Sequence, residues 1–223
     1  MPLKQRRIVS VFWLLILAFF SWLLLRITLT YIPYQTDVGF LRIKQQYIHI
    51  SHWRVAFFIH VYASMFVLLA GFTQFSDPIR RRWPRVHRLM GYVYLLDILM
   101  ITGPASFVMS WYANGGISSR IAFGSLAILW MFSTAMAWRA ALRRQWGLHR
   151  DWMIRSFALT LSALTLRAWK LGIVWVLAPP PMDVYRVVAW LGWIPNLLLA
   201  EYLIRQYQRP AQTAGHPVLG QSA

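Results

Sequence analysis

Residues 53–75 read WRVAFFIHVYASMFVLLAGFTQF, and this apolar run decides the class of fold. It is long enough to cross a bilayer, because a membrane-spanning helix needs about 20 mostly apolar residues. Arg54 and His60 are its only basic residues, and it contains no Asp or Glu. The run therefore predicts a membrane-spanning α-helix.

Five further segments have a similar length and composition, although some contain polar residues. With Trp53–Phe75 they predict an all-α bundle of six transmembrane helices, and they are Ile8–Thr30, Leu89–Trp111, Ile121–Ala141, Trp152–Ala178 and Val184–Tyr207. The first segment follows basic residues, as a signal peptide does, but it is long and no small-residue cleavage site follows it, so we expect an uncleaved span. We expect one membrane domain over residues 1–207 and a polar, disordered tail over residues 208–223.

The composition agrees with a membrane protein. Of the 223 residues 58% are hydrophobic and only 13% are charged, whereas a soluble domain carries about 25% charged residues. The net charge of +17 comes from short basic clusters between the apolar runs, so it does not indicate nucleic-acid binding. The chain has no cysteine, which excludes disulfides, cysteine-ligated iron–sulfur clusters and covalently attached haem.

The distribution of Lys and Arg predicts the orientation of the bundle. Of the 23 basic residues, five lie at one set of span ends: Arg42, Lys44, Arg54, Arg120 and Arg186. Fifteen lie at the opposite ends: Lys4, Arg6, Arg7, Arg80, Arg81, Arg82, Arg85, Arg88, Arg139, Arg143, Arg144, Arg150, Arg155, Arg205 and Arg209. Because cytoplasmic loops are enriched in Lys and Arg, we expect both termini on the cytoplasmic side.

Four ionisable residues lie inside predicted spans, where charges are costly and indicate function by default: His60, Asp97, Arg167 and Lys170. At about 1.5 Å of rise per residue, His60, Asp97 and Arg167 could meet in one layer near the middle of the membrane. We expect an ion pair between Asp97 and Arg167, which either joins two helices or belongs to a functional site. Lys170 is near enough to a span end to reach the interface.

Two His-Arg pairs, His87-Arg88 and His149-Arg150, open the third and fifth spans at the same predicted side. Two neutral imidazoles on facing helices could hold one haem b, with His87 and His149 as its axial ligands. Arg88 and Arg150 could then neutralise the haem propionates. Alternatively the histidines bond loop carbonyls or phospholipid head groups, or take part in proton or quinone chemistry. His60 has no partner histidine at its depth.

The segment from His60 to Arg167 resembles the bacterial membrane-protein family designated domain of unknown function 2306. The matching pieces are Ile59-His60-Val61, residues 71–75 (GFTQF), residues 86–94 (VHRLMGYVY), residues 149–156 (HRDWMIRS) and Thr165-Leu166-Arg167. The resemblance implies a multi-helix fold in the bacterial inner membrane and draws attention to His60, His87, His149 and Arg167. It implies no activity.

Three functions are compatible with these features. The first is a redox protein that binds haem b and exchanges electrons with a quinone or a protein partner. The second is a small-molecule transporter or binder that uses the His60, Asp97 and Arg167 layer. The third is a membrane accessory subunit without a cofactor. Whether the protein is an enzyme is left open by the sequence.

Overall fold

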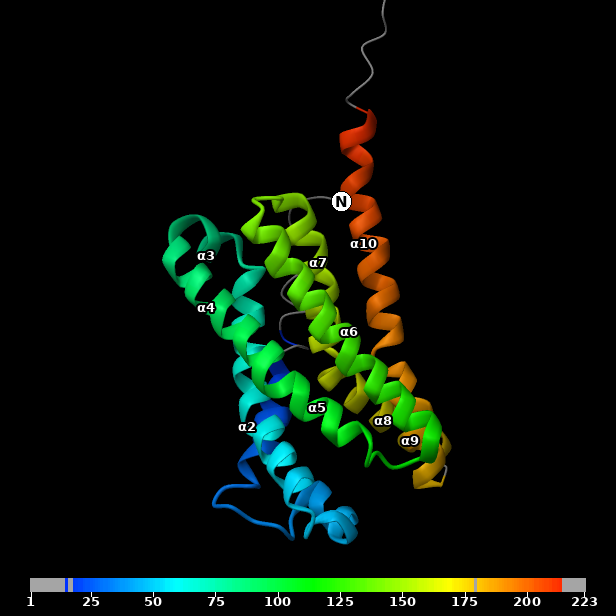
Figure 1. Cartoon of the computed structure of the whole chain (residues 1–223). Coiled ribbons are helices and arrows are strands. Elements are labelled where there is room, and N and C mark those ends of the chain that lie inside the picture. Colours follow the sequence, from blue (N-terminus) through cyan, green and yellow to red (C-terminus); the bar gives the residue numbers. More distant parts are fainter. Residues whose placement is uncertain (1–14, 16–17, 179, 214–223) are drawn as a thin grey trace, which may run out of the picture.

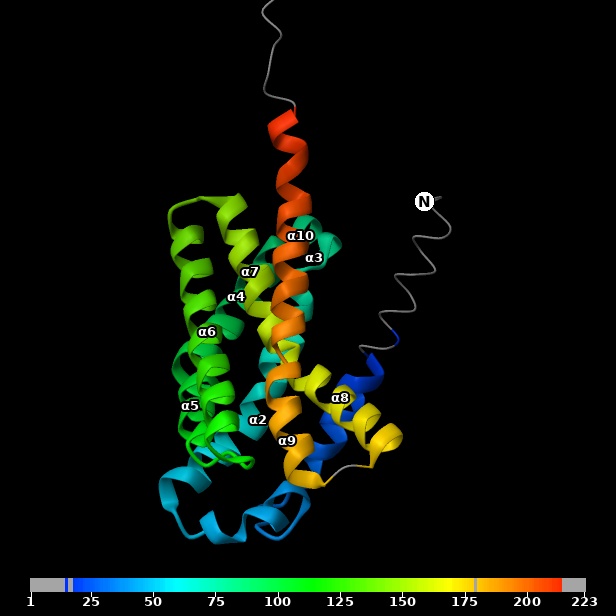
Figure 2. The same cartoon turned by 90° about the vertical axis from the view of Figure 1, so that its right-hand side faces the viewer.

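The structure, a computed structural model, describes residues 15, 18–178 and 180–213. Its regular structure in these ranges is entirely helical, without a strand (Figures 1 and 2). The prediction of an all-α fold is therefore confirmed. The elements are a short helix Ala18–Leu29, the 3₁₀ helix η1 (Gly39–Tyr47), α2 (Ser51–Gln74), α3 (Asp77–Arg82), α4 (Pro84–Leu96), the π-helix η2 (Asp97–Thr102), α5 (Gly103–Ser110), α6 (Gly116–Leu142), α7 (Trp146–Thr160), α8 (Ser162–Leu177), α9 (Pro181–Leu191) and α10 (Ile194–Thr213).

Five helical stretches are long and apolar enough to cross a membrane. They are Ser51–Gln74, Pro84–Ser110, Gly116–Leu142, Trp146–Leu177 and Pro181–Gln206. They correspond to the second to sixth predicted spans. Part of the first predicted span lies outside the described residues, and the described remainder, Ala18–Leu29, is shorter than a span. The helix α10 continues to Thr213, which is beyond the predicted end of the sixth span at Tyr207.

The turns of the bundle gather at its two ends, as alternating spans require. Figure 1 shows α3, the α6–α7 turn and the C-terminal end of α10 at one end. The segment with η1, the α5–α6 turn and the α8–α9 turn lies at the other end. The basic turns thus share one end of the molecule, which we call the basic end. Its cytoplasmic location, and that of the termini, stays a prediction of the charge rule.

A kink at Leu161 divides the fifth predicted span, Trp152–Ala178, into α7 and α8 (Figure 2). No Pro or Gly stands at the break. Instead Asn196 of α10 donates to the carbonyl of Ala158 (3.1 Å) and to Thr165 Oγ1 (3.0 Å), so it bonds both sides of the kink. Side-chain hydrogen bonds to the backbone locally replace helix bonds and bend helices. The fifth predicted span thus corresponds to one helical stretch, Trp146–Leu177, that is kinked at Leu161.

A second irregularity lies in the third span, where the π-helix η2 joins α4 to α5. Pro104 follows η2 and has no N–H group to donate to the carbonyl four residues before it, so a regular α-helix cannot continue through this point. The wider turn closes with the N–H of Gly103 bonded to the carbonyl of Ile98. A Cβ at Gly103 would collide with that carbonyl and with Met131 of α6. Glycine thus permits both the π-turn and the close approach of α6.

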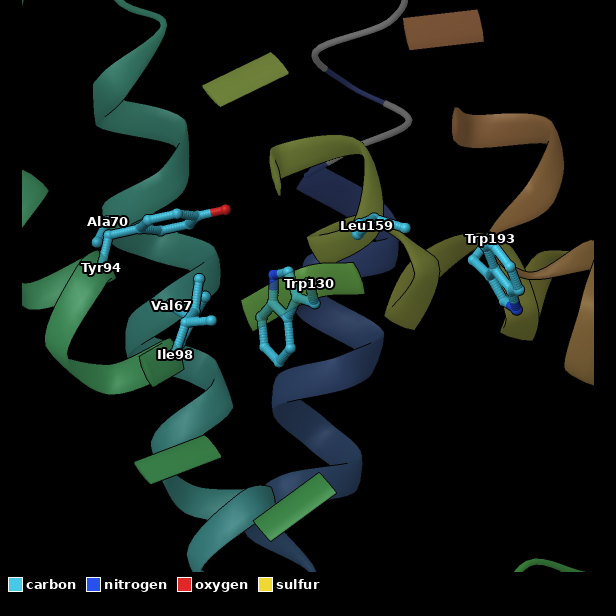
Figure 3. Close-up of a cluster of buried hydrophobic side chains, with 7 residues drawn as sticks. All are labelled: Val67, Ala70, Tyr94, Ile98, Trp130, Leu159 and Trp193. Atoms are coloured by element: carbon cyan, nitrogen blue, oxygen red, sulfur yellow. The ribbon is translucent and has the colours of Figure 1, made fainter. Parts of the chain in front are cut away.

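The core of the bundle lies where α2, α4, α6 and α7 meet. Figure 3 shows its buried members, which are Val67, Ala70, Tyr94, Ile98, Trp130, Leu159 and Trp193. Gly71 allows this approach, because a Cβ there would lie 2.5 Å from the ring of Phe157. Small residues such as glycine permit close approach of helices in membrane proteins.

The segment between the first helix and α2 packs on the turn between α5 and α6 through a buried lysine. Lys44 is 2% exposed, and its Nζ donates to the backbone carbonyl of Tyr112. The ammonium group also lies 4.9 Å from the ring centre of Tyr47, a cation–π distance. Burial, followed by repulsion from Arg120, lowers the pKa of Lys44 from 10.5 to about 8.

We expect this lysine to make thermal stability depend on pH. Between about pH 8 and 10.5 the unfolded chain retains a proton that folded Lys44 has released. Raising the pH across this interval therefore stabilises the fold. Melting temperatures measured in neutral detergent should rise from pH 8 to pH 10 in the wild type relative to Lys44→Met, which lacks the group. A difference between the two proteins that stays constant over this range would contradict the prediction.

Candidate functional site

The histidines at the basic end come from two helices, with His87 in the first turn of α4 and His149 in the first turn of α7. Both are half-buried, and they are close enough for a Coulomb interaction between them. His149 Nδ1 lies 2.9 Å from the carbonyl of Ala137. Because a carbonyl only accepts, Nδ1 carries the proton and Nε2 keeps its lone pair for a ligand. His87 Nδ1 is buried and has no hydrogen-bond partner among the described residues.

The neighbouring arginines differ from each other in their surroundings. Arg88 is exposed, and its Nε donates to the carbonyl of Pro84 (3.4 Å). Arg150 forms an ion pair with the buried carboxylate of Asp151 (3.2 Å). The second oxygen of that carboxylate accepts a hydrogen bond from Gln208 of α10 (2.9 Å). Gln208 thus joins α10 to α7 through Asp151, and Arg150 pairs with the same carboxylate, whereas Arg88 has no carboxylate partner in the described part of the chain.

Nearer the middle of the bundle, the side chain of Ser106 connects His60 of α2 to η2. The Ser106 hydroxyl lies 2.6 Å from the carbonyl of Thr102 and 2.9 Å from His60 Nδ1. Its single proton goes to the carbonyl, so His60 Nδ1 must donate to Ser106. Neutral His60 therefore has its lone pair on Nε2. This nitrogen can therefore act as a base and accept a proton from a ligand.

Asp97 begins the π-helix and is 6% exposed. Its Oδ1 is buried without a hydrogen-bond partner in the described part of the chain. π-turns occur frequently at functional sites, and a buried polar atom without a partner calls for an explanation. Asp97 and the Ser106–His60 pair are connected through Thr102, whose hydroxyl donates to the Asp97 carbonyl (3.2 Å).

The expected ion pair between Asp97 and Arg167 is not formed. Arg167 lies on α8, beyond the kink at Leu161, and its only hydrogen-bond acceptor among the described residues is the carbonyl of Ala163. Arg167 is nevertheless near enough to interact electrostatically with His60. His60 and Arg167 therefore lie near each other in this layer. Asp97 makes no contact with Arg167. Lys170 is exposed on α8, as a residue that reaches the interface would be.

A buried hydroxyl network lies between the two ends, and sequence reasoning found only part of it. The hydroxyl of Tyr94 on α4 contacts Ser156 Oγ (2.9 Å) and Thr160 Oγ1 (2.7 Å) on α7. From α6, Trp130 Nε1 donates to Thr160 (2.9 Å) and Thr134 Oγ1 contacts Ser156 (2.7 Å). Ser156 and Thr160 are four residues apart, so the sequence alone predicts that they share one helix face. The three partners on α4 and α6 could not be paired with them from spacing alone.

Arg155 and Glu201 form a second connection that the sequence did not reveal. The guanidinium of Arg155 on α7 makes two hydrogen bonds to the Glu201 carboxylate of α10, at 2.5 and 2.9 Å. This bidentate pair lies at the basic end and holds α10 against α7. The described residues contain no group of three or more His, Asp or Glu side chains that could hold a metal ion.

These features define a polytopic helical membrane protein with polar groups at two levels of its bundle. The chain belongs to the family of predicted membrane proteins called DUF2306, whose family model matches residues 57–204. The resemblance noted from the sequence motifs is therefore confirmed. No curated protein and no solved structure matches the chain.

Proposed function

We propose that this protein binds one haem b between His87 and His149 and transfers electrons in the membrane. The observation that carries the proposal is the position of the two histidines on separate helices at one end of the bundle, within electrostatic range of each other. The hydrogen bond from His149 Nδ1 to Ala137 is the arrangement that orients a metal-ligating histidine and leaves Nε2 for the metal.

The other side chains at this end fit the same proposal. His87 Nδ1 is buried without a partner among the described residues, so His87, unlike His149, has no Nδ1 hydrogen bond there that orients its ring, and we propose that its Nε2 binds the haem iron. Arg88 is the better candidate for a propionate contact, because it has no carboxylate partner among the described residues and Arg150 already pairs with Asp151. When bound, haem supplies reversible one-electron oxidation. The protein's own contribution is to orient the ligands and neutralise the propionates, and the electron partner would be a quinone or another protein.

A visible absorption spectrum tests the proposal. Protein purified in mild detergent from cells with an ample haem supply should show haem b bands that shift on reduction. His87→Ala and His149→Ala should each lose these bands, because each removes an axial ligand. His49→Ala is the matched control, since His49 is exposed at the opposite end of the bundle and should leave the spectrum unchanged. Wild-type protein without haem bands, or variants that retain them, would contradict the proposal.

The polar layer near the middle of the membrane favours a second candidate, a binder or transporter of a small anion. Its support is Arg167, a guanidinium inside a span whose only acceptor in the described residues is a backbone carbonyl. A cation placed in this way attracts an anionic or carbonyl oxygen. His60 would offer Nε2 to the same ligand. Purified protein that lacks haem but takes up an anion in an Arg167-dependent manner would favour this candidate over the first.

A further inference from the structure

At the end of the bundle opposite the basic end, a shallow pocket of about 460 Å³ lies between the η1 segment and the α5–α6 turn. Two arginines, Arg42 and Arg120, line it together with the side chains of Gln45, Gln46 and Asn114. No Asp or Glu belongs to its lining. The Gln45 amide already donates to the carbonyls of Thr36 and Leu41. The other four side chains offer N–H groups, so the wall of the pocket is rich in hydrogen-bond donors and carries positive charge.

Neither arginine is neutralised by a carboxylate in the described residues. Arg42 donates through Nε to the backbone carbonyl of Asp37 (3.1 Å) and makes no ion pair with that residue's carboxylate. Arg120 is exposed on the first turns of α6 and has no hydrogen-bond partner in the described part of the chain. Both guanidinium groups therefore keep N–H donors for a ligand.

Two more cations stand behind the pocket wall. Lys44 is buried next to Tyr47, which lines the pocket, and its pKa is lowered first by burial and then by repulsion from Arg120. Arg186 of α9 donates to the carbonyl of Gly115 (3.1 Å), which holds the turn that begins α6 at the pocket edge, and it forms an ion pair with Asp183 (3.3 Å). The N-terminal end of α6 adds the partial positive charge of a helix dipole.

This concentration of charge is unusual for its side of the molecule. The charge rule predicts few Lys and Arg residues at the end opposite the basic end, and only five of the chain's basic residues are assigned to that end. Four of the five surround this pocket: Arg42, Lys44, Arg120 and Arg186. Arg186 is paired with Asp183, whereas Arg42, Lys44 and Arg120 have no carboxylate partner among the described residues. Arg120 repels Lys44, and a bound anion would relieve that repulsion.

We infer that the pocket binds a phosphate-type oxyanion, either free phosphate or the phosphate of a phospholipid head group. Guanidinium forks match the oxygens of phosphate in pairs, and the amide N–H groups of Gln46 and Asn114 can satisfy the remaining oxygens. A volume of about 460 Å³ also leaves room for an organic substituent on the phosphate. This inference does not depend on the haem proposal, which concerns the opposite end of the bundle.

Calorimetric titration of the full-length protein in neutral detergent tests the inference. Inorganic phosphate and a short-chain phosphatidylglycerol serve as separate probes. The double variant Arg42→Gln/Arg120→Gln should weaken binding by about tenfold or more, since it removes the charge-assisted hydrogen bonds of both guanidinium groups. The matched control is Arg54→Gln, which removes one charge from the same end of the bundle but not from the pocket.

The two probes also identify the source of the oxyanion. Binding of inorganic phosphate that the double variant loses and Arg54→Gln retains supports a site for a free oxyanion. Binding of phosphatidylglycerol alone, with the same dependence on the arginines, supports a lipid head-group site. The inference is overturned if neither probe binds the wild type, or if Arg54→Gln weakens binding as much as the double variant does.

Discussion

Gly103→Ala is expected to destabilise the protein by about 1–3 kcal/mol, the usual cost of forcing an atom into a packed core. The added Cβ would collide with the carbonyl of Ile98, which is the acceptor that closes the π-turn, and with Met131 of α6. Relief requires either rearrangement of the π-helix or displacement of α6. Thermal unfolding in neutral detergent, followed by intrinsic tryptophan fluorescence, should show a clear decrease in melting temperature.

Gly172→Ala is the matched control for this substitution. Gly172 lies inside α8, and a Cβ there would meet no atom within 4 Å. Because alanine is favoured over glycine in a helix by roughly 1 kcal/mol, this variant should be as stable as the wild type or more stable. Equal melting temperatures for the wild type and Gly103→Ala would show that the π-turn does not require glycine.

Tyr94→Phe is expected to cost about 1–3 kcal/mol, because it removes one hydroxyl and leaves buried polar partners behind. The Tyr94 side chain is completely buried, and its hydroxyl contacts both Ser156 and Thr160. Figure 3 shows this hydroxyl pointing from α4 into the interior of the bundle. Without it the remaining hydroxyl groups have fewer partners in a region that water does not reach. The same thermal unfolding assay in detergent measures the loss.

The neighbouring residue Tyr92 provides the comparison for Tyr94. Tyr92 is 57% exposed on the same helix and makes no hydrogen bond in the described residues. Tyr92→Phe should therefore leave the melting temperature unchanged. Similar melting temperatures for Tyr92→Phe and Tyr94→Phe would mean that the buried network contributes nothing measurable to stability. Haem bands retained in Tyr94→Phe would in addition separate this network from the proposed haem site.

Apolar run length predicted the second to sixth spans well, because burial in a bilayer depends on local composition. Trp53–Phe75 coincides closely with α2 (Ser51–Gln74), and Ile121–Ala141 lies within α6 (Gly116–Leu142). The kink at Leu161 escaped prediction because its cause, Asn196, lies on another helix. The π-helix was missed for a related reason, since Pro104 indicated a local break but not its geometry.

Some features of the candidate site residues could likewise be predicted from the local sequence, whereas others depend on contacts between helices. Periodicity correctly placed Ser156 and Thr160 on one face of a helix, and charge counting put His87 and His149 at one end of the bundle. Depth alone suggested that Asp97 pairs with Arg167, but the kink at Leu161 turns α8 out of line with α7, and the two charges stay apart. Spacing also could not identify Glu201 as the partner of Arg155.

The sequence by itself determined that this is an all-helical membrane protein, where most of its spans lie and which turns share an end. These properties follow from the cost of exposing backbone and charge to lipid, which each segment meets on its own. Only the tertiary structure decided which polar groups meet: Tyr94 with Ser156, His60 with Ser106, and the arginines around the outer pocket. Such contacts depend on how helices rotate, bend and approach one another, and these features arise from packing between segments that lie far apart in the chain.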